Sequence, residues 1–166
     1  MAVFLQLVFL LVLAGFFVFF ITQAYNIIFR GYAPFLSTRK PVIDKILAET
    51  AVKDEAVVYE LGAGTAGFLH AMRRKYPRAK LIGVEYSFWP YWLARFQSAI
   101  TGAKIAMMKK NIFQVGVKDA DLIYCYLNVE TMERLEKMFR EECKPGCMVV
   151  SYQFPLPHLP TAKVIE

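Results

Sequence analysis

Two acidic residues and a glycine-rich turn are the parts of this sequence best suited to chemistry. Glu60 lies at the end of an apolar, β-branched run and is followed by a turn over residues 62–67 with the spacing Gly-x-Gly-x-x-Gly. A second apolar run ends at Glu85, about 20 residues beyond the turn, where a carboxylate commonly meets a ribose diol. Glycines suit such a turn because the backbone must bend sharply and lie close to a bound nucleotide-like molecule. The pattern therefore predicts a pocket for an adenosine-type cofactor.

The position of Glu60 distinguishes between two classes of cofactor. It precedes the first glycine of the turn, Gly62, where a dinucleotide would place its pyrophosphate. An ionised carboxylate there would repel a diphosphate but attract the cationic amino group and the sulfonium of S-adenosylmethionine. Together, Glu60 and Glu85 favour S-adenosylmethionine over NAD. The alternative is a glycine turn used only to pack a strand closely on a helix, but it does not explain two acids at the ends of apolar strands.

The residues expected to contact the cofactor follow the first two apolar runs. They are Glu60, Gly62, Ala63, Gly64 and Gly67 after the first run, and Glu85 and Tyr86 after the second.

The beginning of the chain predicts a membrane anchor over residues 1–24. Residues 2–21 are apolar apart from Gln6, and no charged side chain occurs before Arg30. About twenty such residues span a bilayer as a helix. A cleaved signal peptide is the alternative, but it would have a shorter apolar core and a basic start. Because basic residues follow the anchor and none precedes it, we expect the remaining chain on the cytoplasmic side, or in an equivalent compartment such as an organelle matrix.

The composition of the remaining chain limits its partners. Residues 25–40 carry several aromatic rings and are expected to form a linker along the membrane interface. The net charge of +6 belongs to the linker and the domain, where it suits a bilayer with anionic lipid. The basic residues are scattered and no nucleic-acid-binding module is present, so nucleic acid is not an expected partner. Cys143 and Cys147 have no second pair or nearby histidine to complete a metal site, so we expect reduced thiols and no metal.

Residues 41–166 are expected to form one α/β domain. Helices are expected over residues 41–50, 66–76, 90–100 and 129–142, and strands over 57–61, 80–85, 105–108, 121–127 and 147–152. Strands that alternate with helices predict right-handed crossovers and a doubly wound, mostly parallel sheet. Ser37 or Thr38 is expected to cap the first helix, and the basic cluster at residues 73–78 is expected to interact with the end of the second helix rather than with a ligand.

The order of these elements, the stretch Glu60-Leu61-Gly62-Ala63-Gly64, the acid Glu85 and the polar Asn111 after the third strand resemble the class I S-adenosylmethionine-dependent methyltransferases, which have a Rossmann-like fold. The resemblance implies that Asn111 and the adjacent Ile112 contact the adenine. Residues 33–38 after the anchor and residues 153–158 near the chain end are similar to membrane-anchored protein-lysine methyltransferases. Those enzymes act on the adenine nucleotide translocase and on the ATP synthase c subunit, and they have prokaryotic relatives.

This sequence departs from the family pattern in three places. Thr65 follows the second glycine, where the family often has Asp, and Glu60 stands where Asp is common. Too few residues follow the fifth strand for the two further strands of the full class, so we expect either an abbreviated sheet or a truncated chain.

Methyl transfer mainly requires that the nucleophile be aligned with the methyl group, and a lysine nucleophile must first lose its proton. Tyr126, Asn128 and Gln153 follow the fourth and fifth strands and are the catalytic candidates; Tyr126 could also contact an alkylammonium through cation–π attraction. Asn128 could equally cap the following helix. His158 is a weaker candidate, since a histidine among prolines near a chain end is more often a surface residue than a base. The resemblance implies a further contribution from Ser37 and Thr38.

The favoured function is a membrane-anchored S-adenosylmethionine-dependent methyltransferase that methylates a lysine of a membrane protein. Two alternatives stay open. The enzyme could methylate a lipid headgroup or a small molecule, or the chain could be an inactive, membrane-tethered module that only binds the cofactor.

Overall fold

The computed structural model describes residues 1–30 and 37–165, with side chains described for residues 1–25 and 37–165. The chain consists of two units, Met1–Phe35 and Leu36–Glu166. The boundary between them lies inside the predicted linker, residues 25–40. Residues 31–36 of that linker are outside the described residues, so its interfacial position stays a prediction.

The first unit contains one long helix, α1 (Ala2–Arg30). Its segment Ala2–Tyr25 has 24 residues and a mean hydropathy of 2.8, with none of its most apolar part buried. Length and composition would allow this segment to cross a membrane, although a signal sequence near an N-terminus has the same properties.

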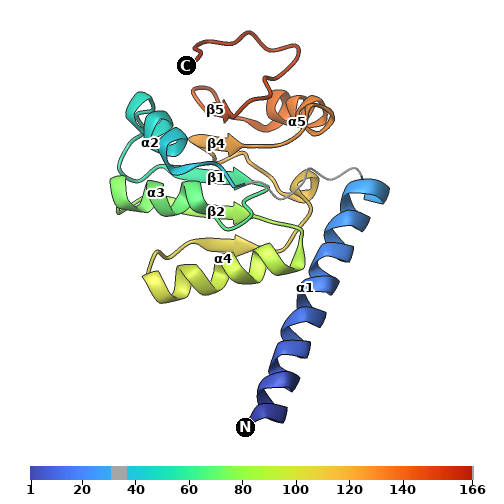
Figure 1. Ribbon diagram of the computed structural model, residues 1–166. Coiled ribbons are helices and arrows are strands. Elements are labelled where there is room, and N and C mark those ends of the chain that lie inside the picture. The colour runs from blue at the N-terminus through green and yellow to red at the C-terminus, as the bar shows by residue number, and fades with distance from the viewer. Residues whose placement is uncertain (31–36, 166) are drawn as a thin grey trace. The chain divides into compact units, whose positions relative to one another are not determined.

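The second unit is built on a five-stranded parallel sheet (Figure 1). The strands are β1 (Val57–Leu61), β2 (Lys80–Val84), β3 (Ala106–Met108), β4 (Leu122–Cys125) and β5 (Met148–Ser151), in the order β3-β2-β1-β4-β5. The central strand, β1, pairs with β2 on one side and β4 on the other, so that Glu60 lies between Gly83 and Tyr124. Open sheets of this type bind ligands beyond the carboxyl ends of their strands, where the strand order reverses, and here that point is beside β1.

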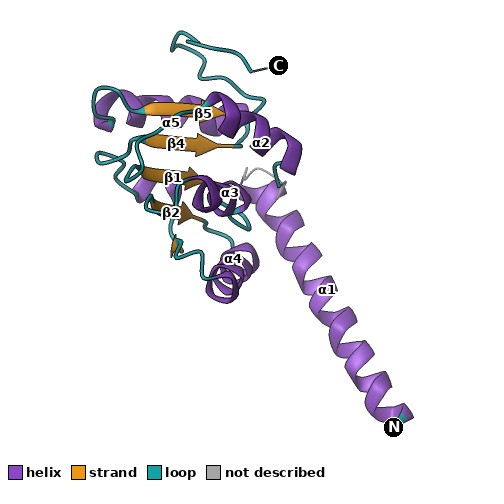
Figure 2. Ribbon diagram, turned by 90° about the vertical axis from the view of Figure 1, so that its left-hand side faces the viewer, coloured by secondary structure: helices purple, strands orange, loops and turns teal. Residues whose placement is uncertain are grey.

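Helices cover both faces of the sheet (Figure 2). They are α2 (Lys40–Glu49), α3 (Gly67–Lys75), α4 (Phe88–Thr101) and α5 (Val129–Glu142), with a short 3₁₀ helix, η1 (Ile112–Gln114). On one face, apolar side chains of α2 and α3 pack on the sheet in a core that α4 joins through Ala94. On the other face, Met132, Leu135 and Phe139 of α5 form the second core. The predicted doubly wound α/β fold is confirmed.

The observed elements differ from the predicted ones in their ends. The helix predicted to begin at Pro90 begins at Phe88, because proline is tolerated in the first turn, where its missing N–H has no partner to lose. The fourth strand ends at Cys125, so Tyr126 lies in the loop beyond it. The predicted cap of the first helix is wrong: Arg39 takes the cap position and makes no side-chain capping bond, while the Thr38 hydroxyl is bonded elsewhere.

Candidate functional site

The glycine turn follows β1 directly and folds back over the end of β2. Gly62 and Gly64 have φ of +73° and +55°, a left-handed conformation that favours glycine. The backbone N–H groups of Gly62 and Ala63 both donate to the carbonyl of Val84 at 2.9 Å. Gly67 differs, since a Cβ there would lie 3.8 Å from Ile43, an ordinary contact distance. The backbone geometry therefore favours glycine at the first two positions, whereas a role of Gly67 in cofactor binding stays a prediction.

Gly83 in the middle of β2 supports this turn and was not singled out in the sequence analysis. A Cβ at this position would lie 2.5 Å from the sulfur of Met107 and 3.2 Å from the Cβ of Ala63. The absent side chain thus lets the turn and β3 approach β2 closely. A glycine inside an apolar strand was the available signal, because glycine weakens a strand unless another group must come near.

Glu85 connects the glycine turn to the start of α4. Its Oε2 accepts a hydrogen bond from the Gly64 N–H at 2.9 Å, and its Oε1 accepts one from the Ser87 N–H at 2.7 Å. The side chain is buried. Since each carboxylate oxygen has two lone pairs, both can still accept a hydroxyl hydrogen bond, as the ribose prediction requires.

Glu60 is a buried carboxyl at the first turn of α3. Its Oε2 accepts a hydrogen bond from the Leu69 N–H at 3.3 Å. Burial raises the pKa of Glu60 to about 8; backbone N–H donors of α3 oppose the rise and the nearby charge of Glu85 adds to it. Within the described part of the chain, neither Glu60 nor Glu85 forms an ion pair with Lys or Arg. The site therefore contains two neighbouring buried carboxyls and lacks a compensating cation from the described chain.

This set of groups fits S-adenosylmethionine. A cation placed beside Glu60 would favour the ionised carboxylate and offset the cost of its burial. Glu85 offers acceptors suited to a diol on the other side of the glycine turn, whose backbone leaves no side chain in the way at Gly62 and Gly64.

The remaining predicted cofactor residues follow β2 and β3. Tyr86 comes directly after Glu85, and the Nζ of Lys109 lies 5.8 Å from the centre of its ring. Asn111 caps η1, because its Oδ1 accepts a hydrogen bond from the Phe113 N–H at 3.1 Å. Ile112 is half-buried against the second core. Because β1, β2 and β3 are parallel, these residues share one edge of the sheet with Glu60 and Glu85, and their contacts with the cofactor stay predictions.

Two of the three catalytic candidates lie together beyond β4 and β5. The Tyr126 hydroxyl donates a hydrogen bond to the Gln153 Oε1 at 2.9 Å, and the Tyr126 ring lies against Tyr152 with centroids 4.8 Å apart. Gln153 has a φ of +68°, so the chain makes a left-handed bend at this residue, shortly after the end of β5. Asn128 instead caps α5, since its Oδ1 accepts from the Thr131 N–H at 3.0 Å. The structure gives Asn128 the capping role, and a catalytic role for any of the three stays a prediction.

A buried tyrosine next to Glu60 was missed by the sequence analysis. Tyr124 of β4 stacks on Phe68 with ring centroids 4.2 Å apart, and its hydroxyl shares a 2.6 Å hydrogen bond with Thr38. This bond holds the segment before α2 against β4, next to Glu60. A tyrosine inside the otherwise apolar run of β4 was the available signal for this hydrogen bond, but its partner, Thr38, is remote in sequence.

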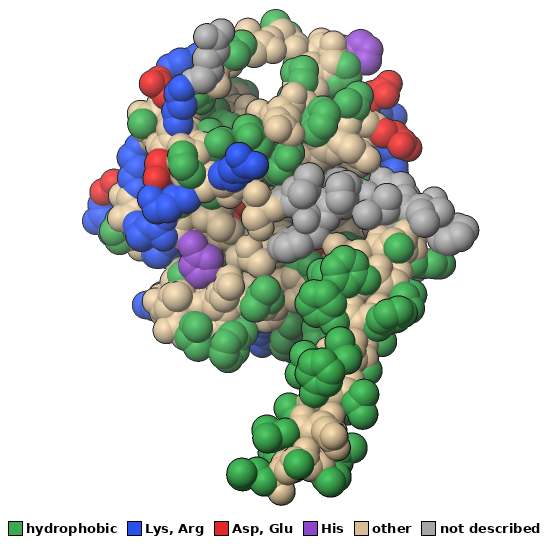
Figure 3. All heavy atoms as spheres, viewed as in Figure 1, with side chains coloured by type: hydrophobic (Ala, Val, Ile, Leu, Met, Phe, Trp, Pro, Cys, Tyr) green, Lys and Arg blue, Asp and Glu red, His purple; other side chains and the backbone are tan. Residues whose placement is uncertain are grey.

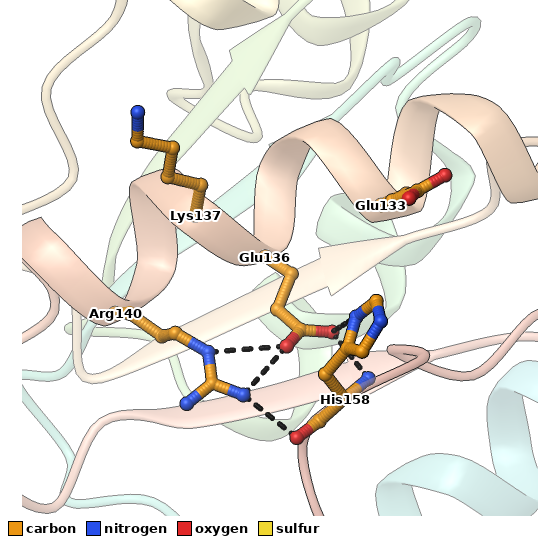
Figure 4. Close-up of a pocket in the computed structure, with 5 residues that line it drawn as sticks. All are labelled: Glu133, Glu136, Lys137, Arg140 and His158. Atoms are coloured by element: carbon orange, nitrogen blue, oxygen red, sulfur yellow. Dashed lines mark hydrogen bonds and ion pairs between the residues drawn. The ribbon is translucent and has the colours of Figure 1, made fainter.

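The segment that carries Gln153 and His158 is fastened to α5 by Glu136 (Figure 4). Glu136 is buried, and its Oε1 accepts from the Arg140 Nε at 3.1 Å and Nη2 at 2.7 Å. Its Oε2 accepts from the His158 backbone N–H at 2.8 Å, while the imidazole is mostly exposed. Burial opposes ionisation of Glu136, but these hydrogen bonds hold its pKa below the usual range. His158 thus contributes mainly its backbone, and a Glu–Arg pair one helical turn apart was the available signal for Glu136.

The basic cluster at residues 73–78 bonds with neighbouring loops, and the three cysteines form no disulfide. Arg73 donates to the carbonyls of Ala103 and Pro77, and Lys75 donates to the carbonyl of Leu47, so part of the cluster holds neighbouring loops. Arg78 pairs with Asp54 at the surface. The three cysteines are free, and the described residues contain no group of three or more His, Cys, Asp or Glu side chains placed to hold a metal.

Comparison with known proteins gives the family. The sequence model of the ANTKMT methyltransferase domain matches residues 60–163. A relative named protein-lysine N-methyltransferase, from Saccharolobus islandicus (strain REY15A), is 25% identical over 127 residues, covering 75% of this chain and 79% of the relative.

Solved structures show the same fold. An RNA methyltransferase from Salinibacter ruber in complex with S-adenosyl-L-homocysteine has a TM-score of 0.75 and 23% identity, covering 79% of this chain and 86% of that one. PKMT2 from Rickettsia typhi, in complex with AdoHcy, has a TM-score of 0.54 and 16% identity, covering 61% and 21%. The chain therefore belongs to the family of the ANTKMT methyltransferase domain, and the class I, S-adenosylmethionine-dependent methyltransferase predicted from the sequence is confirmed.

Proposed function

We propose that this protein is a protein-lysine N-methyltransferase that works at a membrane, on a lysine of a membrane protein. The observation that carries the proposal is the pair of buried carboxyls, Glu60 and Glu85, on either side of a glycine turn and without a cation from the described chain. Such a pair suits a cofactor that has a ribose and a cationic methionine moiety. The name of the Saccharolobus relative supports lysine as the acceptor.

Bound S-adenosylmethionine would supply a methyl group already activated by its sulfonium. The residues of this chain would therefore need only to bind the cofactor and to align the lysine amine with its methyl group. Gln153 has an Oε1 lone pair left after it accepts from Tyr126, and this oxygen could orient the N–H of a lysine amine. The rings of Tyr126 and Tyr152 offer faces suited to an alkylammonium group. Because Gln153 and its hydrogen bond with Tyr126 are exposed, water is available to take the proton that the lysine must lose.

The membrane part of the proposal is supported by α1 and by charge. The segment Ala2–Tyr25 is long and apolar enough to span a bilayer, and several basic residues, from Arg30 onward, follow it in sequence. The positive-inside rule would place the second unit on the cytoplasmic side or its matrix equivalent. An enzyme tethered in this way encounters membrane proteins at a high effective concentration.

The test is to incubate the full-length protein with membranes and methyl-labelled S-adenosylmethionine, and to separate protein from lipid. Label on lysine side chains, located by mass spectrometry, is expected; label in the lipid extract alone would overturn the lysine assignment. At a concentration of S-adenosylmethionine that just saturates the wild type, Glu60→Gln should lose most of the transfer, while Glu55→Gln, the same change at an exposed position, should keep it. Calorimetry with S-adenosylmethionine tests the alternative of an inactive, membrane-tethered module that only binds the cofactor. Binding without transfer of label to either protein or lipid would support that alternative.

A further inference from the structure

Helix α4 exposes an unusual set of large apolar side chains. Six of them are between 45% and 67% exposed: Phe88, Trp89, Trp92, Leu93, Phe96 and Ile100, here called the α4 face. Hydrophobic side chains are visible along the lower edge of the domain, where α4 lies (Figure 3). Contiguous apolar patches of this kind are uncommon on soluble proteins and mark contact with a partner or a membrane.

The α4 face occupies one side of the helix. Phe88, Trp92, Phe96 and Ile100 follow one another at intervals of four residues, and residues this far apart share one side of a helix. The opposite side is buried and consists of Pro90, Tyr91, Ala94 and Ser98. The helix thus packs mostly small residues on the domain and leaves its largest ones outside. Complete burial of a large apolar side chain contributes about 1.5–3 kcal/mol, and since these side chains are already about half buried, removing the rest of each from water would contribute about half of that.

Basic groups accompany the α4 face. The guanidinium of Arg95 lies 5.3 Å from the centre of the Trp92 ring, and Lys109 lies against Tyr86, close to the start of the helix. The sequence of α4 contains no Asp or Glu. Tryptophan and tyrosine rings beside Arg and Lys are typical of helices that lie in the headgroup region of anionic bilayers.

We propose that the α4 face lies on a bilayer containing anionic lipid, with its aromatic rings inserted at the boundary between headgroups and acyl chains. The proposal rests on the proposed membrane anchoring by α1. Residues 31–39 connect α1 to α2, and at ~3.5 Å per residue they span roughly 30 Å at most, so a membrane-spanning α1 would keep the second unit close to the bilayer.

Docking through α4 would also set the orientation of the site. The helix begins at Phe88, directly after Ser87, whose N–H is bonded to Glu85. The aromatic first turns of α4 therefore lie beside the edge of the sheet where Glu60 and Glu85 are found. A bilayer bound to these turns would hold the transfer site near the membrane surface, where lysines of membrane proteins are exposed.

Intrinsic fluorescence can test this directly, because the chain has only two tryptophans, Trp89 and Trp92, and both belong to the α4 face. The full-length protein is reconstituted into vesicles of phosphatidylcholine and phosphatidylglycerol, with or without lipids brominated near the top of the acyl chain. We expect brominated lipid to remove about half of the fluorescence and aqueous iodide to quench it weakly. Lipids brominated near the chain end should quench less.

Variants and flotation separate the possible outcomes. Phe96→Ser combined with Ile100→Ser should weaken lipid quenching at least twofold without preventing flotation with the vesicles, while Val129→Ser, at an exposed position on α5, should change neither. Quenching by iodide but not by brominated lipid would overturn the proposal, because the rings would then be in water. Protection from both quenchers would also overturn it, since protein would then cover the helix. A chain that does not float would overturn the anchoring as well, whereas methyl transfer is measured independently.

Discussion

Replacing Glu60 with glutamine tests whether this carboxyl is retained for its charge at a cost in stability. Glutamine has nearly the same shape and keeps a carbonyl oxygen for the Leu69 N–H. Burial raises the pKa of Glu60 from 4.5 to about 8 in the folded protein. At pH 7 the folded protein must therefore hold a proton that the unfolded chain has lost. At about 1.4 kcal/mol per pH unit, this costs roughly 3 kcal/mol of stability.

The sign of the pH dependence follows from the raised pKa. Stability associated with protonated Glu60 is fully present below about pH 4.5 and is lost as the pH rises to about 8. Relative to the wild type, Glu60→Gln should therefore gain about 3 kcal/mol of stability between pH 4 and pH 7, because glutamine does not ionise. The cost of burying the amide is the same at both pH values and shifts the whole difference by a constant amount. Denaturant unfolding followed by circular dichroism across this pH range measures the difference.

The same substitution should remove a proton release that accompanies cofactor binding. Because burial raises the pKa of Glu60 to about 8, most of the folded protein carries this proton at pH 7, so binding that requires the carboxylate should release most of one proton, less the small amount taken up by the cofactor amine. Titration calorimetry in buffers of different ionisation enthalpy measures this number. Glu60→Gln should release almost none and bind S-adenosylmethionine about 10- to 100-fold more weakly. Unchanged affinity with unchanged proton release would refute the assignment of Glu60 to the cationic part of the cofactor.

Three further substitutions test other parts of the structure. Gly83→Ala should displace the neighbouring methionine and the glycine turn, lowering stability by about 1–3 kcal/mol and weakening cofactor binding in calorimetry, whereas Gly116→Ala, where a Cβ has ordinary contacts, should not. Asp121→Asn should cost about 1–3 kcal/mol at pH 7 but little near pH 2. Burial opposes ionisation of Asp121, but its lysine partners and the Val57 N–H lower its pKa to about 2, so its stabilisation is lost as the pH falls from about 4 to 2, which acid unfolding would show. Tyr126→Phe should leave the affinity for S-adenosylmethionine unchanged and slow methyl transfer about 3- to 10-fold, by releasing Gln153; an equal loss of cofactor affinity would contradict this role.

The sheet and the cofactor turn could be predicted because their signals are local. Val57–Leu61 and Lys80–Val84 were identified from short apolar runs, and the left-handed backbone at Gly62 and Gly64 follows from the residue type itself. Each of these signals lies within a few residues of the feature that it predicts.

Contacts between remote segments could not be predicted in the same way. Thr38 appeared suited to capping a helix, but its hydroxyl bonds with Tyr124, which is 86 residues away. Glu136 and His158 meet only because the chain after β5 returns over α5. In α4 both sides of the helix carry apolar residues, so periodicity alone does not indicate which side is buried. These features depend on how elements pack, and a single sequence contains no direct signal for that.

Because β1 lies in the middle of the sheet, it divides the site into a cofactor-binding half beside β2 and a half around Gln153 beside β4 and β5. The two halves should form at different stages of folding. Val57 pairs with Lys80, which is near in sequence, whereas Val58 pairs on the other edge with the distant Leu122. Contacts between near neighbours close at a small entropic cost and form early in folding. The half that binds the cofactor should thus assemble early, while the half around Gln153 depends on β5, which joins the sheet through β4 and so needs the distant pairing of β4 with β1 first. Local opening at β5 would suspend methyl transfer while the cofactor remains bound.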